Sequence, residues 1–250
     1  MKQADCGTAV AGATDAARSA AALILTSPGL SVIQTAITEA RKIFARITSY
    51  TIYRVALTMN IMFLVVLSSI FLNFQPLTAI MIVIMSLLDD LPIMTIAYDN
   101  THISDKPIRW QMKKILTTSS ILGVFAVIQS MILLIVGFMS AKNPGMISWF
   151  AVSDPAQLQT IMFLQLVAGG HLLLFVTRQT RWFFQKPYPA KALFWAIVIT
   201  QVFAACACYF GWLVPKISLG MIGEVWLYNL CWMFILNIIR MIIEKGQAKA

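Results

Sequence analysis

Two adjacent carboxylates, Asp89 and Asp90, stand at the end of a long run of apolar residues. Charged side chains at mid-membrane depth cost on the order of 2.5–3.5 kcal/mol each, so they usually mark a path for an ion or a proton. A carboxyl group in a low-dielectric site holds its proton more tightly than in water, and a nearby positive charge or access to solvent releases it. Because two adjacent carboxylates are expected to titrate as a coupled pair, the pattern suits proton uptake and release.

Pro92 follows the two carboxylates within the same apolar segment. It has no backbone N–H, and its ring obstructs the carbonyl of Leu88, four residues earlier. The sequence therefore predicts a helix break beside Asp89 and Asp90 that leaves carbonyl groups for an ion or water. Two other interpretations stay open: a structural polar patch that only bonds neighbouring helices, and a remnant that has lost its transport chemistry.

Membrane helices are the elements that must position these side chains. Of the 250 residues, 59% are hydrophobic and 12% are charged, and the mean hydropathy is +0.79, which excludes an ordinary water-soluble domain. The predicted fold class is mainly α: a six-helix polytopic transmembrane bundle in a lipid bilayer, residues 51–243, with a cytoplasmic tail at 244–250. The six expected spans are Thr51–Leu72, Pro76–Tyr98, Ile115–Met139, Leu158–Val176, Ala192–Val214 and Met221–Ile243.

Basic residues set the expected orientation. They gather in the connections 99–114 and 177–191 and in the tail, whereas the opposite side carries only Lys142 and Lys216. The positive-inside rule then places both termini in the cytoplasm. Because these basic residues lie at membrane boundaries, the net charge of +9 indicates contact with phospholipid and not binding of nucleic acid. The four cysteines lack metal-type spacing, so neither a disulfide nor a metal site is expected.

The first fifty residues have a different pattern. The stretches CGTAV, ATDAARSAA and LILTSPG predict a strand, a helix of small residues and a second strand. From Ser31 onward the apolar residues keep helical spacing, and no proline or glycine occurs before Pro76. We therefore expect a cytoplasmic stalk helix over residues 31–50 that continues into the first span, preceded by a small α/β remnant.

Several stretches resemble proton-exporting P-type ATPases of the plasma-membrane type, over nearly the whole chain. Residues 1–30 resemble the end of their phosphorylation domain, RITSYTIYR the top of their fifth transmembrane helix, and LLDDLPIMTIAYDN their sixth. KPIRWQM resembles the loop that follows, and LQTIMFLQLVAGGHLLLFVTR the eighth helix. The resemblance implies an integral protein of the plasma (cytoplasmic) membrane in which Asp90 is the proton-carrying carboxylate. Asp89 stands where the family more often has Asn.

The chain also departs from the family pattern. The fifth-helix pattern YRxxETIR has Leu57 and Asn60 in place of its Glu and Arg. That Arg is a natural counter-ion for the sixth-helix Asp, so its loss suggests that Asp90 stays protonated. Polar residues of the family pattern are also replaced at Ala22 and Ser27.

The family's catalytic motifs DKTGT, TGES and GDGxNDxP do not occur in these residues. ATP and magnesium would then act only through a missing or separate part that carries the actuator, nucleotide-binding and phosphorylation domains. We expect no cofactor in this chain and no ATP hydrolysis by it alone. It would be a truncated fragment or one part of a split pump. The alternative is a non-enzymatic six-helix protein, namely an inert remnant, a scaffold or a passive proton leak.

Other polar residues inside the expected spans have two interpretations each. His171 follows Gly169 and Gly170, where a transport role competes with an interhelical hydrogen bond beside glycines that permit close helix approach. Single amides predict interhelical bonds more than ligands; they are Gln129, Gln165, Gln201, Asn229 and Asn237.

Overall fold

A computed structural model describes residues 3–101, 110–142, 152 and 154–249. Residues 102–109 hold most of KPIRWQM and two of the basic residues used for orientation, Lys106 and Arg109; they lie outside the described part. The described residues are mostly helical and include two short strands, so the predicted mainly α class is confirmed.

The chain divides into two compact units, the first reaching Ala45 and the second beginning at Arg46. In the first unit, strand β1 (Thr8–Ala9) pairs in parallel with β2 (Leu23–Ile24), and helix α1 (Asp15–Ser19) lies between them in the sequence. Thr14 begins α1, because its side chain accepts a hydrogen bond from Ala17 N. This order matches the predicted strand, helix and strand.

Six helices in the described part are long and apolar enough to cross a membrane, as predicted, so the chain is an integral membrane protein. They are α2 (Leu30–Leu72), α3 (Ala79–Thr95) with the short 3-10 helix η1 (Ile96–Tyr98), α4 (Met112–Lys142), α5 (Pro155–Thr177), α6 (Lys191–Phe210) and α7 (Leu219–Lys249). The single helix α2 includes both the predicted stalk and the first predicted span.

Two predicted span boundaries were wrong by a few residues, for local reasons. The second span was expected from Pro76, but α3 begins at Ala79 because the side chain of Thr78 accepts a hydrogen bond from Met81 N and caps the helix. The fifth was expected to reach Val214, but α6 ends at Phe210. There Gly211 takes a left-handed conformation, with φ of +78°, and closes the helix.

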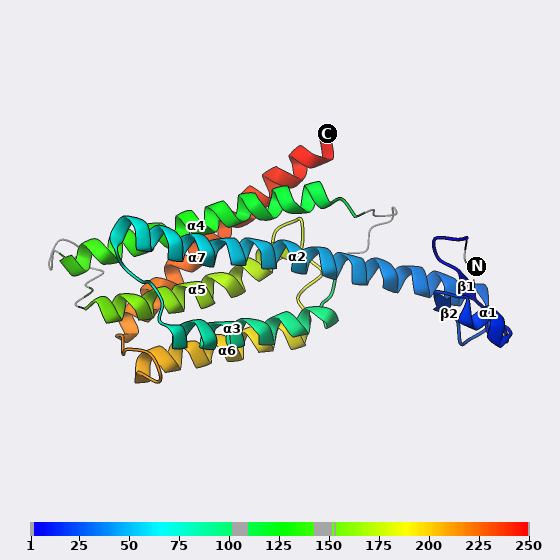
Figure 1. The fold of residues 1–250 in the computed structure, drawn as a ribbon, viewed down its shortest axis with the longest axis horizontal. Helices are drawn as coiled ribbons and strands as arrows, with labels where there is room; N and C mark the ends of the chain where they lie inside the picture. The colour runs from blue at the N-terminus through cyan, green and yellow to red at the C-terminus, as the bar shows by residue number, and fades with distance from the viewer. Residues whose placement is uncertain (1–2, 102–109, 143–151, 153, 250) are drawn as a thin grey trace. The chain divides into compact units, whose positions relative to one another are not determined.

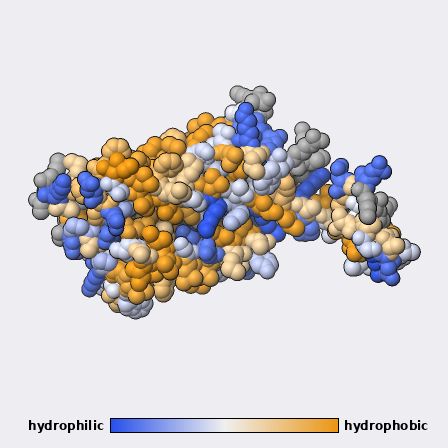
Figure 2. Space-filling model, in the orientation of Figure 1, coloured by the Kyte–Doolittle hydropathy of each residue, from blue (hydrophilic) through white to orange (hydrophobic). Residues whose placement is uncertain are grey.

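Helix α5 lies at the centre of the second unit. Of its most apolar stretch, 89% is buried inside the protein, against 28–44% for the other five spans. It packs against α3, α4, α6 and α7, as Figure 1 shows for the bundle. The outer helices present apolar side chains outward, and Figure 2 shows the largely hydrophobic face that results. Lipid is the solvent for that face.

Candidate ion-binding site

The two neighbouring carboxylates of α3 lie in different environments. The side chain of Asp89 is 3% exposed, whereas that of Asp90 is 57% exposed. Adjacent residues of an α-helix point about 100° apart, so a helix at the edge of a bundle can bury one of them and leave the other exposed. Asp89 therefore faces the interior, and Asp90 lies on an open face of the described chain.

Asp90 has a basic neighbour on the adjacent helix. Arg54 of α2 places Nη1 3.6 Å from Asp90 Oδ1, and its side chain is 44% exposed. The sequence prediction missed this partner, since it looked for a counter-ion only at Asn60. The available signal was the position of Arg54 itself, three residues inside the expected span Thr51–Leu72.

Asp89 lies among buried polar atoms of α2 and α5. His171 Nε2 is 3.5 Å from Asp89 Oδ1. A Cβ atom added at Gly170 would lie 3.6 Å from Asp89 Oδ1 and 3.8 Å from the Tyr53 hydroxyl, so both oxygens border the space beside this glycine. Both atoms are buried and have no hydrogen-bond partner among the described residues. The arrangement leaves a carboxylate oxygen and a hydroxyl, both buried, without hydrogen bonds beside Gly170.

Pro92 does not break the helix, contrary to prediction. Helix α3 continues through it as α-helix to Thr95, whose hydroxyl donates to the Pro92 carbonyl at 2.7 Å. The carbonyl of Leu88, which Pro92 cannot bond, does have a partner other than an ion or water: His171 Nε2 lies 3.3 Å from it. A side chain of the central helix thus satisfies the carbonyl that the proline frees.

His171 is fully buried and bonded on both ring nitrogens. On the far side of the ring, the Gln201 amide of α6 contacts His171 Nδ1, and Gln201 Nε2 also donates to the carbonyl of Val167 at 3.0 Å. His171 therefore connects α3, α5 and α6. The predicted interhelical role of His171 is confirmed by these contacts.

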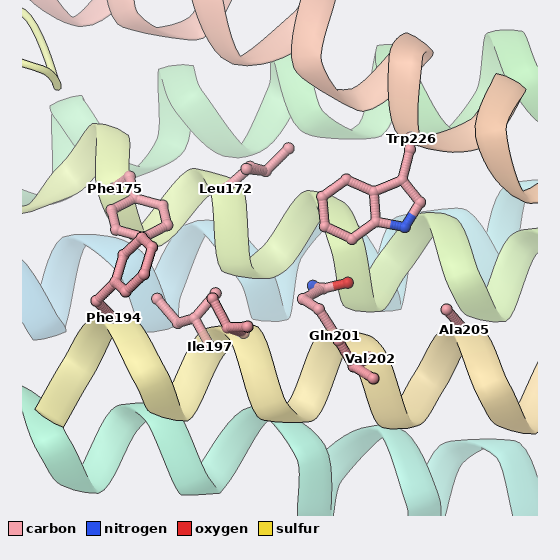
Figure 3. Close-up of a pocket in the computed structure, with 9 residues that line it drawn as sticks. Leu172, Phe175, Phe194, Ile197, Gln201, Val202, Ala205 and Trp226 are labelled. Atoms are coloured by element: carbon pink, nitrogen blue, oxygen red, sulfur yellow. The ribbon is translucent and has the colours of Figure 1, made fainter. Parts of the chain in front are cut away.

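An apolar groove lies beside Gln201, between α5, α6 and α7 (Figure 3). It has a volume of about 390 Å³, and Phe175, Phe194 and Trp226 are among the residues that line it. In Figure 3 the indole of Trp226 reaches in from α7 while the Gln201 side chain extends from α6 toward α5. Gln201 is thus the polar residue that separates the groove from His171.

Asn60, the position of the missing family Arg, joins a cluster of neutral polar side chains. Ser130 Oγ of α4 donates to Asn60 Oδ1 at 2.8 Å, and Gln165 Nε2 of α5 donates to Ser130 Oγ at 3.1 Å. Nearby, Gln129 Nε2 donates to Asn229 Oδ1 of α7 at 2.8 Å. These contacts confirm the predicted interhelical bonding of the amides, while Asn237 instead bonds the backbone of Arg181.

Gly169 lets α5 approach this cluster, which gives a first prediction. A Cβ atom there would lie 2.8 Å from Asn229 Oδ1, so Gly169→Ala must displace the Gln129–Asn229 hydrogen bond. We expect the substitution to lower the free energy of unfolding by about 1–3 kcal/mol, measured by denaturant titration in detergent micelles. Gly223→Ala on α7 is the matched control, because nothing lies within 4 Å of its added Cβ and alanine favours the helix. Equal stability of the two variants would contradict the prediction.

A second pair of charges ties together the ends of α3, α5 and α6. Arg178 Nε and Nη2 donate to the two carboxylate oxygens of Asp99 at 2.9 and 3.3 Å, and both side chains are 3% exposed. Asp99 also accepts from Ala190 N at 2.9 Å. The sequence prediction had counted Arg178 only among the basic residues of the connection 177–191 that set the orientation. Its bidentate geometry shows a structural role instead.

Comparison with known proteins identifies relatives of this chain. Residues 74–245 match the family described as "Cation transporting ATPase, C-terminus". A putative cation-transporting ATPase of Methanocaldococcus jannaschii is 41% identical over 98% of this chain and 29% of its own length. Plasma membrane ATPases 1 and 2 of Schizosaccharomyces pombe are 33% and 32% identical over 92% of this chain, covering 24% and 22% of theirs.

The chain spans less than a third of the length of these curated relatives. The family match covers more than half of the chain and includes α3, α4, α5 and α6 in full, with the carboxylates, His171 and the Asp99–Arg178 pair. The chain therefore belongs to the cation-transporting P-type ATPases, and it corresponds to their C-terminal membrane part.

Proposed function

We propose that this chain provides the membrane path for proton export in an ATP-driven pump, with Asp90 as the carboxylate that takes up and releases the transported proton. The observation that supports this most directly is the Asp90–Arg54 pair, at 3.6 Å between two membrane helices. A positive charge at that distance favours the ionised form of a carboxylate. Arg54 thus offers the counter-ion that Asn60 cannot supply.

The open face of Asp90 fits a role within a longer polypeptide or a split pump. In a complete pump, further membrane segments would pack on this face and control access of water to the carboxylate. ATP and magnesium would act on the part that carries the family's catalytic motifs, and movement of that part would alternately cover and expose Asp90. The relatives named plasma membrane ATPases support a location in that membrane.

The test is transport by a chimera in which this chain replaces the matching part of the Methanocaldococcus relative. Proteoliposomes would contain a pH-sensitive dye, in a choline buffer free of sodium, potassium and calcium. We expect ATP with magnesium to acidify the lumen, because proton export needs no sodium, potassium or calcium. Acidification only after another cation is added, or none with a chimera that hydrolyses ATP, would contradict proton export.

The chain alone, in liposomes with the same dye and a potassium buffer, tests the alternative of a passive proton leak. We expect no proton flux under an imposed potassium diffusion potential, since the interior carboxylate Asp89 is enclosed by α2 and α5. Steady flux that is independent of ATP would favour the passive interpretation.

A further inference from the structure

We propose that Asp89 is a second proton-binding carboxylate and that His171 is its positioning residue, whose Nε2–H bonds Asp89 when that carboxylate is ionised. The proposal rests on the proposed function and deepens it, because it assigns a partner to the interior half of the carboxylate pair.

The hydrogen bonds of Gln201 fix the tautomer of His171. The carbonyl of Val167 can only accept, so the Gln201 atom 3.0 Å from it is the amide nitrogen. The same nitrogen contacts His171 Nδ1, which must then accept and carry no proton. A neutral imidazole with an unprotonated Nδ1 carries its proton on Nε2. Gln201 therefore presents His171 to α3 as a neutral donor.

The Nε2–H of His171 lies between two acceptors on α3. The Leu88 carbonyl is 3.3 Å away and Asp89 Oδ1 is 3.5 Å away. A hydrogen bond to a charged acceptor is roughly twice as strong as one to a neutral acceptor. The carbonyl is therefore the preferred acceptor while Asp89 is protonated, and the carboxylate becomes the preferred acceptor once Asp89 is ionised.

The proton balance of this exchange is simple. The Asp89 carboxyl becomes a carboxylate, and its proton passes to water or to the neighbouring Asp90. His171 gains and loses no proton; only its hydrogen bond changes acceptor. The buried hydroxyl of Tyr53 also has no partner among the described residues, and it borders the same space beside Gly170 as Asp89 Oδ1.

The groups that act on Asp89 come from each helix around it. Arg54 of α2 and Asp90 of α3 are the charged neighbours, one of each sign. Tyr53 of α2 and His171 of α5 are the titratable neighbours that stay neutral in this arrangement. From α6 the neutral Gln201 acts only through His171. Of these groups, His171 places its donor nitrogen Nε2 3.5 Å from Asp89 Oδ1.

The chain has two histidines, which makes the proposal testable by nitrogen NMR of purified protein in lipid nanodiscs. The ¹⁵N signals of His171 are assigned as those lost in His171→Leu. We expect an unprotonated Nδ1 and a protonated Nε2, and an Nε2–H signal that moves with pH as Asp89 titrates. In Asp89→Asn the movement should disappear, while in Asp90→Asn it should persist.

Three outcomes would overturn the proposal: a protonated Nδ1, an Nε2–H signal that does not move with pH, or movement that persists in Asp89→Asn. The wild-type protein carries the main measurement, so a variant that fails to fold does not remove the test. As a second variant, Gln201→Leu should allow both neutral tautomers of His171 and give a mixture of Nδ1–H and Nε2–H signals. The NMR result does not depend on pumping, so it can support the proposal even if the chimera exports no protons.

Discussion

Substitution of Arg178 by Met should lower the free energy of unfolding by about 3–5 kcal/mol, the cost of leaving a buried charge without its partner. Asp99 would lose two hydrogen bonds to the guanidinium, at 2.9 and 3.3 Å, while its side chain stays 3% exposed. The backbone carbonyls of Pro187 and Asn100 would also lose the donors that Arg178 supplies at 3.0 and 2.8 Å. The measurement is reversible unfolding in mixed detergent micelles.

The exposed pair Lys42–Glu39 provides the matched control. Its atoms are 2.6 Å apart, but the two side chains are 32% and 51% exposed, so Lys42→Met should change stability by less than about 0.5 kcal/mol. The double variant Asp99→Asn with Arg178→Met should recover part of the lost free energy of unfolding, because the unpaired carboxylate of Asp99 is replaced by a neutral amide. If Arg178→Met costs no more than Lys42→Met, Asp99 and Arg178 do not form a buried structural pair.

The positions of the membrane helices were predictable from the sequence, but their rotation was not. Six apolar runs give six spans because a membrane helix needs about 20 apolar residues, whatever its packing. Helix α3 is apolar on all sides, so no periodicity indicates which of Asp89 and Asp90 faces the interior. That choice depends on contacts with α5 and α2, which a single sequence does not contain.

The missed partners have a similar physical explanation. Arg178 is the last residue of the eighth-helix stretch, where a basic residue ordinarily faces the membrane surface, but here it is buried in its pair with Asp99. Pro92 was expected to break α3 from local sterics alone. The helix stays continuous since Thr95 bonds the Pro92 carbonyl and His171 contacts that of Leu88. In both cases, the burial of the Arg178 charge and the proline within α3, contacts with distant parts of the chain offset an unfavourable local effect.

Replacement of Asp90 by Asn should reduce ATP-driven acidification by the chimera about 100-fold or more, the scale expected when a group that handles the proton is lost. An amide has nearly the same size, but it cannot take up and release a proton at neutral pH. Asp5→Asn, at an exposed position of the first unit, is the matched control and should leave the rate unchanged. The measurement is the initial rate of dye response after ATP addition.

Arg54→Gln should have a smaller effect than Asp90→Asn, because the pair is half exposed and contributes about 1 kcal/mol or less. Arg54→Lys keeps a positive charge beside Asp90 and should retain most of the rate. The transport rates of the Asp89→Asn and Asp90→Asn variants show which carboxylate carries the transported proton. If Asp89→Asn abolished transport and Asp90→Asn did not, the transported proton would be carried by the interior carboxylate, and Arg54–Asp90 would be only a surface ion pair.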